Sequence, residues 1–334
     1  MEFALGGQLS VRITPDDVGK RVSIRTRLPE DTPGARFTDT LGHLTSWENG
    51  VLLVTRRDGE AVRLDERDLV AAKVVPPATR RGRRLRGGPG TDTAELERIA
   101  ARGWPAVDRE PLGDWLLRAA DGFTWRANST LALGDPGVPV ERAVDEVADW
   151  YHARGLPGTV VVVDPRGEGA ALDALLEHRG WTVRAAALLS LAPLPPLTDA
   201  PEDARVRVER ALTEEWLTGY RSSGPEARAV LTGGPSVWFV TVPDARGDGT
   251  PAARGRCVVE GRWAGFNAVE VSPRWRRHGL ATAVMAALAR VALSEGATTG
   301  YLQVEPDNEG ALALYEGLGF VEHHRYHYRV QPRT

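Results

Sequence analysis

The chain has 334 residues, of which 42% are hydrophobic, and a formal net charge of -3 at pH 7. Its length exceeds that of one small core and indicates two or three domains. The near-neutral charge excludes the whole-molecule basic field that would make nucleic acid the main expected partner. A single cysteine, Cys257, excludes an intramolecular disulfide and therefore a disulfide-stapled secreted domain.

Targeting and membrane segments are not evident. Residues 1–10 lack the basic segment and apolar core of a secretory signal, and no run approaches the roughly 18 apolar residues of a membrane span. We therefore expect a cytoplasmic protein with no membrane contact.

Residues 1–76 predict a small all-β domain. Short β-like runs alternate with turn residues at 9–13, 21–27, 41–47, 50–55, 61–64 and 69–75. Asn49-Gly50 and Asp58-Gly59 are hairpin signals between these runs. The order of turns resembles an SH3-like barrel. A docking or packing role is the simpler interpretation, and a nucleic-acid or peptide reader is the alternative.

Residues 77–91 predict a linker, because they are rich in glycine and arginine and have no apolar periodicity. Residues 92–196 then predict a helix at 95–101, strands at 115–120 and 123–133, a helix at 140–154, a strand at 159–163, a helix at 170–179 and a strand at 181–190. The proline-rich residues 191–201 predict a second linker.

From residue 205 the order of elements repeats. Residues 174–181 (ALLEHRGW) match residues 313–320 (ALYEGLGF) without gaps, and 163–165 (VDP) correspond to 304–306 (VEP). Opposite Tyr315 the first copy has Leu176, and before its long helix it has GVPV at 137–140. We interpret the first copy as a degenerate half that keeps the fold and has lost the cofactor chemistry.

The run 276–281 (RRHGLA) lies between a β-like segment at 266–271 and a long apolar helix at 280–295. Gly279 lets the backbone approach a bulky anion, and the helix N-terminus offers unpaired N–H groups and a positive dipole end. This pattern predicts a pyrophosphate site, although alone it would also fit a plain strand–helix turn.

Residues 205–331 resemble a member of the GNAT superfamily of acyl-CoA-dependent N-acyltransferases. Arg276, Gly279 and Ala281 fit the Q/R-x-x-G-x-G/A signature of that family, and strand 301–304, Asn308, Tyr315, Gly319-Phe320 and a closing strand at 323–330 follow in order. The resemblance implies an α/β fold with a mixed sheet. Its fourth and fifth strands, here 266–271 and 301–304, would splay apart around the pantetheine arm of the cofactor.

The resemblance further implies that acetyl-CoA is the cosubstrate. Backbone N–H groups of 277–282 would hold its pyrophosphate, and Asn308, a standard helix N-cap, would also contact it. The candidate cofactor-binding residues are Val269, Glu270, Val271, Arg276, Arg277, His278, Gly279, Leu280, Ala281, Thr282, Asn308 and Tyr315.

Tyr315 is the candidate general acid, although its place in an apolar stripe also fits a core aromatic. In the family, a tyrosine here protonates the departing CoA thiolate, and a phenol is protonated at neutral pH. The general base is open. Gly265 and Gln303 occupy the positions where some family members carry a glutamate, so Glu270 and Glu305 are the candidates. The alternatives are a base acting through water and an amine that arrives already deprotonated.

His323, His324 and His327 invite a metal interpretation. On a strand, His323 and His327 would share one face and His324 the other, and no third ligand has a recognisable spacing. We predict no metal site, and we expect these side chains on the strand surface beside the acceptor cleft.

Together these features predict direct acetyl transfer from acetyl-CoA to a primary amine in a ternary complex, with backbone N–H groups near Glu270 and Val271 holding the oxyanion. The first half would form one side of the acceptor cleft, where the candidate contacts are Trp115, Trp125, Arg126 and Asn128, although core packing is the simpler interpretation of the two tryptophans. Two alternatives are a non-catalytic CoA-responsive regulatory protein and a histone-like or nucleoid protein lysine acetyltransferase. The acceptor, a small molecule or a protein, is left open.

Overall fold

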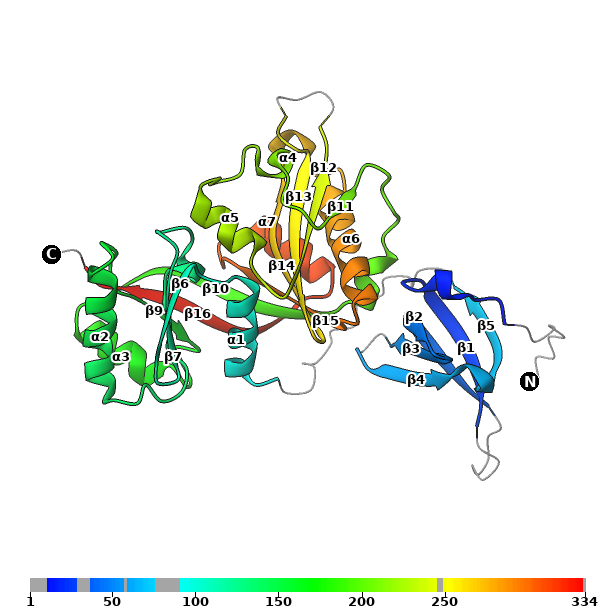
Figure 1. The fold of residues 1–334 in the computed structure, drawn as a ribbon, viewed down its shortest axis with the longest axis horizontal. Helices are drawn as coiled ribbons and strands as arrows, with labels where there is room; N and C mark the ends of the chain where they lie inside the picture. Colours follow the sequence, from blue (N-terminus) through cyan, green and yellow to red (C-terminus); the bar gives the residue numbers. More distant parts are fainter. Residues whose placement is uncertain (1–10, 29–36, 57–58, 76–90, 245–248, 333–334) are drawn as a thin grey trace.

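The computed structural model describes residues 11–28, 37–56, 59–75, 91–244 and 249–332, which form a five-stranded and an eleven-stranded sheet (Figure 1). The small sheet has the order β4-β3-β2-β1-β5. Its strands are β1 (Arg21–Arg27), β2 (Phe37–Glu48), β3 (Val51–Thr55), β4 (Ala61–Asp65) and β5 (Leu69–Val74).

Alternating apolar residues build the core of this N-terminal domain. Val22, Ile24, Leu44 and Leu52 are fully buried in it. Asn49 and Gly50, both at positive φ, form the predicted hairpin turn between β2 and β3. Of the predicted strand at 9–13, Val11 forms an isolated bridge with Ala72, whereas residues 9 and 10, Asp58 of the second hairpin signal and residues 77–90 of the linker lie outside the described residues.

The large sheet has the order β11-β12-β13-β14-β15-β10-β16-β9-β8-β7-β6. Its strands are β6 (Asp108–Leu112), β7 (Trp115–Ala119), β8 (Thr130–Leu131), β9 (Thr159–Val163), β10 (Thr182–Pro193), β11 (Arg207–Glu209), β12 (Ser236–Val242), β13 (Ala253–Glu260), β14 (Trp263–Val271), β15 (Thr299–Val304) and β16 (Val321–Val330). The helices are α1 (Thr93–Gly103), α2 (Val140–His152), α3 (Ala170–His178), α4 (Glu214–Leu217), α5 (Pro225–Thr232), α6 (Leu280–Ser294) and α7 (Glu309–Gly317).

The two halves exchange their last strands. β10, from the first half, lies between β15 and β16, and β16, from the second half, lies between β10 and β9 (Figure 1). The pairings are similar: β15 pairs antiparallel with β10, placing Val304 opposite Leu188, and β9 pairs antiparallel with β16, placing Val163 opposite Tyr326. The segments 92–196 and 205–331 therefore share one sheet, and each half is completed by a strand of the other.

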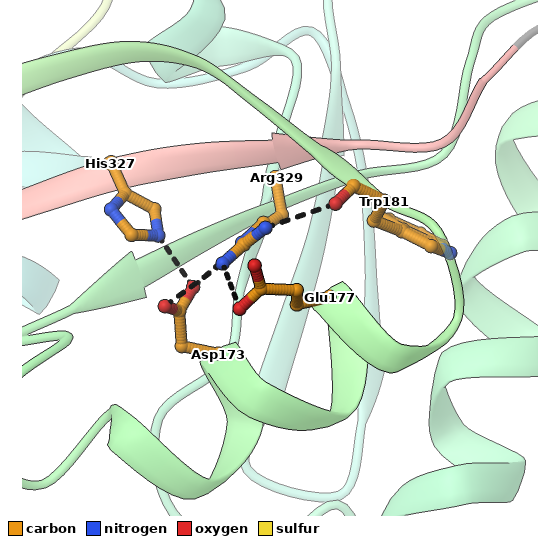
Figure 2. A network of polar contacts seen from close by, with 5 residues as sticks. All are labelled: Asp173, Glu177, Trp181, His327 and Arg329. Atoms are coloured by element: carbon orange, nitrogen blue, oxygen red, sulfur yellow. Dashed lines mark hydrogen bonds and ion pairs between the residues drawn. The ribbon is translucent and has the colours of Figure 1, made fainter.

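An ion-pair network fastens β16 to the first half (Figure 2). Arg329 donates to Asp173 of α3 at 2.8 Å and to the carbonyl oxygen of Trp181 at 3.0 Å, and it lies 3.4 Å from Glu177. His327 Nε2 lies 2.6 Å from the same Asp173 carboxylate. Burial opposes the ionisation of Asp173, but hydrogen bonds from Arg329 and His327 hold its pKa below the ordinary value.

The predictions for two segments are wrong. Residues 191–201 are not a linker, because β10 continues to Pro193 and is followed by a 3-10 turn (Pro195–Asp199) in which Leu197 is buried, as is the preceding Leu194. These side chains join the core beneath α6. Residues 123–133 do not form one strand: Trp125–Ala127 is a 3-10 turn, and only Thr130–Leu131 pairs as a strand.

Within the described ranges, no helix has both the length and the apolar character needed to cross a membrane.

Candidate functional site

β14 and β15 part at a defined point. They pair in parallel from Trp263, opposite Thr299, to Phe266, opposite Leu302, and no further pairing between them occurs in the described chain. Beyond this point the register between β13 and β14 shifts, and Ala268 has a positive φ of 49°. A β-bulge therefore turns the end of β14 away from β15, as the family resemblance implied for residues 266–271 and 301–304.

A buried arginine supports the bulge. Arg256 of β13 is fully buried and donates to the carbonyl oxygens of Leu231 and Gly103 and to the side-chain oxygen of Asn267, beside Ala268. Burial lowers the pKa of Arg256 to about 10. Because the three acceptors of Arg256 belong to α5, α1 and β14, its hydrogen bonds hold these elements together beside the opening.

The predicted anion site lies at the start of α6. A short 3-10 turn (Pro273–Trp275) leads into exposed residues 276–279, and Arg277 and Gly279 have positive φ values of 65° and 78°. No described residue accepts a hydrogen bond from the backbone N–H groups of 277–282. The turn is anchored through Trp275, whose indole donates to Asp244 at 2.7 Å. A helix N-terminus with free amides and nearby guanidinium groups suits a phosphate ligand.

α7 carries the other two predicted cofactor residues. Asn308 caps it, because its Oδ1 accepts a hydrogen bond from the backbone N–H of Ala311 at 3.1 Å. Tyr315 packs edge-to-face on Phe320, with ring centroids 5.8 Å apart. Burial raises the pKa of Tyr315 to about 12, and its hydroxyl has no hydrogen bond to a described residue. The phenol is therefore protonated at neutral pH and free to donate.

The two candidate bases differ in their surroundings. Glu270 lies 3.6 Å from Arg254 and 3.8 Å from Arg221, so two guanidinium groups compete for its carboxylate. Glu305 follows β15 and is exposed. The position of Gly265 has no room for a glutamate, because a Cβ there would lie 2.4 Å from the ring of Tyr301.

The four candidate acceptor contacts in the first half differ in burial and in whether they reach the opening. Trp115 is buried and donates to the carbonyl oxygen of Gly134. Asn128 is buried, and both its side-chain oxygen and its side-chain nitrogen form hydrogen bonds to the backbone of its own loop. Trp125 is 42% exposed and stacks on Tyr328, whereas Arg126 donates to Gln303 at 2.8 Å. Of the four, Arg126 therefore reaches the opening between β14 and β15.

The histidine geometry differs from the strict alternation predicted for a strand. A register shift in β16 brings the Nδ1 atoms of His323 and His324 to 2.8 Å from each other, so these side chains do not point to opposite faces. His324 is buried and lies 2.8 Å from Glu97 of α1, whereas His327 faces Asp173. These histidines thus connect β16 to α1 and α3. Sequence reasoning missed Glu97, because its partner is more than two hundred residues away.

Comparisons with known proteins cover nearly the whole chain. A family model described as "Probable histone acetyltransferase Rv0428c C-terminal" matches residues 91–329, and one described as "Rv0428c N-terminal Sm-like domain" matches residues 16–73. The chain is 29% identical over 316 residues to "Probable histone acetyltransferase Rv0428c" of Mycobacterium tuberculosis, covering 93% of this chain and 94% of that protein.

Two further matches agree on the fold or the chemistry. "Uncharacterized N-acetyltransferase YobR" of Bacillus subtilis is 26% identical over 251 residues, covering 72% of this chain and 99% of that protein. The solved structure of a GCN5-related N-acetyltransferase from Kribbella flavida matches with a TM-score of 0.54 at 19% identity, covering 72% of this chain and 96% of that one. The predicted α/β GNAT fold is confirmed. The prediction of a small N-terminal β domain is also confirmed. The family model that matches this domain is Sm-like, so the SH3-like type is not confirmed.

Proposed function

The chain belongs to the Rv0428c family and is an N-acetyltransferase of the GNAT fold, and on that premise we propose that it uses acetyl-CoA as donor through the opening between β14 and β15. One observation carries this proposal: the two strands part after Phe266 and Leu302, in the half of the chain that also presents the free helix N-terminus of α6.

The donor is held by the second half. The free backbone N–H groups of 277–282 bind the pyrophosphate, with Arg276, Arg277 and His278 adding donors and charge. The edge of β14 at Val269, Glu270 and Val271 holds the pantetheine arm and the thioester carbonyl, and Asn308 contacts the cofactor from α7.

The amine nitrogen attacks the thioester carbonyl, so that a C–N bond forms and the C–S bond breaks. Backbone N–H groups near Glu270 and Val271 stabilise the oxyanion, and Tyr315 donates its proton to the leaving sulfur. The amine loses its proton to water in the opening, with Glu305 as the candidate acceptor of that proton. Glu270 is a weaker candidate because Arg254 and Arg221 already engage it.

The test is release of CoA thiol by the full chain with acetyl-CoA and a panel of amines, peptides and basic proteins, with acetylated products identified by mass spectrometry. Thiol release that depends on an amine supports the proposal. Binding of acetyl-CoA without amine-dependent release would favour a CoA-responsive regulatory protein instead.

A basic protein acceptor is the second candidate, because the Mycobacterium tuberculosis relative carries the name of a probable histone acetyltransferase. Thiol release with lysine-rich proteins alone would support protein lysine acetylation.

A further inference from the structure

Arg126, in the first half, reaches the site of the second half. It lies in the turn Trp125–Ala127, and its Nη1 donates to Oε1 of Gln303 at 2.8 Å. Gln303 directly follows Leu302, the last residue of β15 that pairs with β14. The guanidinium also lies over the indole of Trp104, 4.7 Å from the ring centroid. Arg126 is therefore placed where the two strands begin to part.

The loop that carries Arg126 is held from several sides. Asn128 accepts hydrogen bonds from the N–H groups of Ala120 and Gly122 and donates to the carbonyl oxygens of Phe123 and Thr124. Ala127 is fully buried in a cluster against which the bulge residue Ala268 packs.

The same loop contains backbone strain. Thr124 is β-branched and has a φ of 61°, a backbone conformation that is unfavourable for such a residue. Its hydroxyl accepts a hydrogen bond from the Trp104 indole at 3.0 Å. A strained loop fixed this firmly places its side chains accurately.

Arg126 has no counter-ion within the described part of the chain. It is half-buried, and no carboxylate lies within ion-pair distance of it. Glu97, which lines a small cavity together with Arg126, is already engaged by His324 at 2.8 Å. A half-buried guanidinium without a counter-ion favours an anionic ligand, because the attraction to the anion offsets part of the cost of removing the guanidinium from water.

The surroundings of Arg126 offer several donors and one carboxylate, that of Glu97, which His324 already engages. A cavity of about 10 Å³ here is lined in part by Glu97, Trp104, Arg118, Arg126, Gln303 and Tyr328. Since Arg126 occupies the side-chain oxygen of Gln303, the amide of Gln303 has its N–H groups left to offer. An anionic group that reaches this point from the opening between β14 and β15 would therefore meet donors from Arg126 and Gln303.

We propose that Arg126 binds an anionic group, a carboxylate or a phosphate, on the amine acceptor, so that the substrate is a small amine bearing such a group. This inference rests on the acetyl transfer proposed above. A lysine in a basic segment would instead bring further positive charge to an uncompensated guanidinium, which is unfavourable.

The test measures thiol release by the full chain with matched acceptors. The panel contains the proteinogenic amino acids with their α-amides, phosphoethanolamine with ethanolamine, and a lysine-rich histone-tail peptide. We expect the anionic member of a productive pair to have a kcat/KM at least about tenfold above that of its neutral partner, because a charge-assisted hydrogen bond is lost with the anion. The carboxylate and phosphate pairs distinguish the two anions.

Arg126→Gln should raise the KM for the anionic acceptor about tenfold with little change in kcat. It should also abolish the preference for the anionic member of the pair. Arg126→Lys should retain part of that preference. Arg109→Gln removes an exposed arginine on β6 of the same half and is the control. It should change neither the KM for the anionic acceptor nor the preference within the pair. Acetyl-CoA affinity, measured by calorimetry, should be the same in all variants.

The inference would be overturned by equal use of acids and amides, by preference for the histone-tail peptide, or by a preference that survives Arg126→Gln. Absence of thiol release with the whole panel, in a protein that binds acetyl-CoA, would also reject this acceptor class. Failure to bind acetyl-CoA would instead reject the proposed function itself.

Discussion

At the scale of single residues, Tyr315 is half-buried, its hydroxyl has no hydrogen bond to a described residue, and desolvation raises its pKa to about 12. Tyr315→Phe keeps the ring against Phe320 and removes the donor. We expect kcat to fall about 100-fold, the usual contribution of a positioned acid, with acetyl-CoA affinity and thermal stability retained. Steady-state kinetics and calorimetry measure these quantities.

The raised pKa also fixes the pH dependence of this step. An acid must be protonated to act, and its activity is lost as pH rises through its own pKa. The wild-type kcat should therefore show no alkaline decline from Tyr315 between about pH 8 and about pH 10. Wild-type turnover in Tyr315→Phe would remove this residue from the mechanism.

Gly279 and Gly296 flank the same helix, α6, and form a matched pair. Both have a positive φ, and a Cβ on either would meet no atom within 4 Å. Each change to alanine should therefore cost similar stability, about 1–2 kcal/mol, from the left-handed backbone. Gly279→Ala alone should also weaken acetyl-CoA binding, because its Cβ would enter the anion site. Equal acetyl-CoA affinities of the two variants would argue against that site.

Local residue patterns predicted where some of the site residues lie and failed to predict the contacts of others. The helix cap at Asn308 and the start of α6 at Gly279 follow from local sequence preferences. The contact between Arg126 and Gln303 joins residues far apart in the chain, and no local pattern specifies the partner. The expectation that His323 and His324 point apart failed because a β-bulge breaks the two-residue alternation.

At the scale of elements, the Asp173 network attaches β16 to α3. Asp173→Asn removes the charge that faces Arg329 and His327, so we expect a loss of about 2 kcal/mol in the free energy of unfolding at pH 7. Asp145→Asn breaks an exposed pair with Arg179 and should cost much less. Chemical denaturation of both variants measures the difference.

The pH dependence of this network follows from the lowered pKa of Asp173. A carboxyl group whose pKa is lower in the folded state stabilises the protein above its unfolded pKa, and that contribution is lost as pH falls through the folded value. Wild-type stability should therefore drop below about pH 4 more than that of Asp173→Asn. Identical acid profiles would show that Asp173 does not hold β16.

Periodicity predicted most elements well. The strand at 159–163 was located from its run of buried β-branched residues, and α2 from its amphipathic pattern. The errors at 123–133 and 191–201 share a physical cause. In both segments tertiary contacts decide the structure: the hydrogen bonds of Asn128 in the first, and the burial of Leu194 and Leu197 in the second.

At the scale of the whole molecule, the exchange of β10 and β16 makes the halves interdependent. The core of the C-terminal half contains Leu188, Ala192, Leu194 and Leu197, all of which precede residue 205. A fragment of residues 205–334 would lack these side chains and leave the edge of β15 unpaired. We expect this fragment to aggregate, and residues 91–334 to be soluble and to bind acetyl-CoA.

Size-exclusion chromatography and circular dichroism check this expectation. A monomeric, folded 205–334 fragment that binds acetyl-CoA would contradict it. The sequence repeat predicted two related halves, but it could not predict the exchange, because strand order depends on which edges meet in three dimensions.

The proposed single cofactor site in the second half is tested most directly by amide hydrogen exchange with and without saturating acetyl-CoA. We expect acetyl-CoA to slow exchange at the free N–H groups of 277–282 and at 269–271 of β14, and to leave residues 137–140 of the first half unchanged. Unchanged exchange at 277–282, or slowing at 137–140 instead, would contradict a single acetyl-CoA site in the second half.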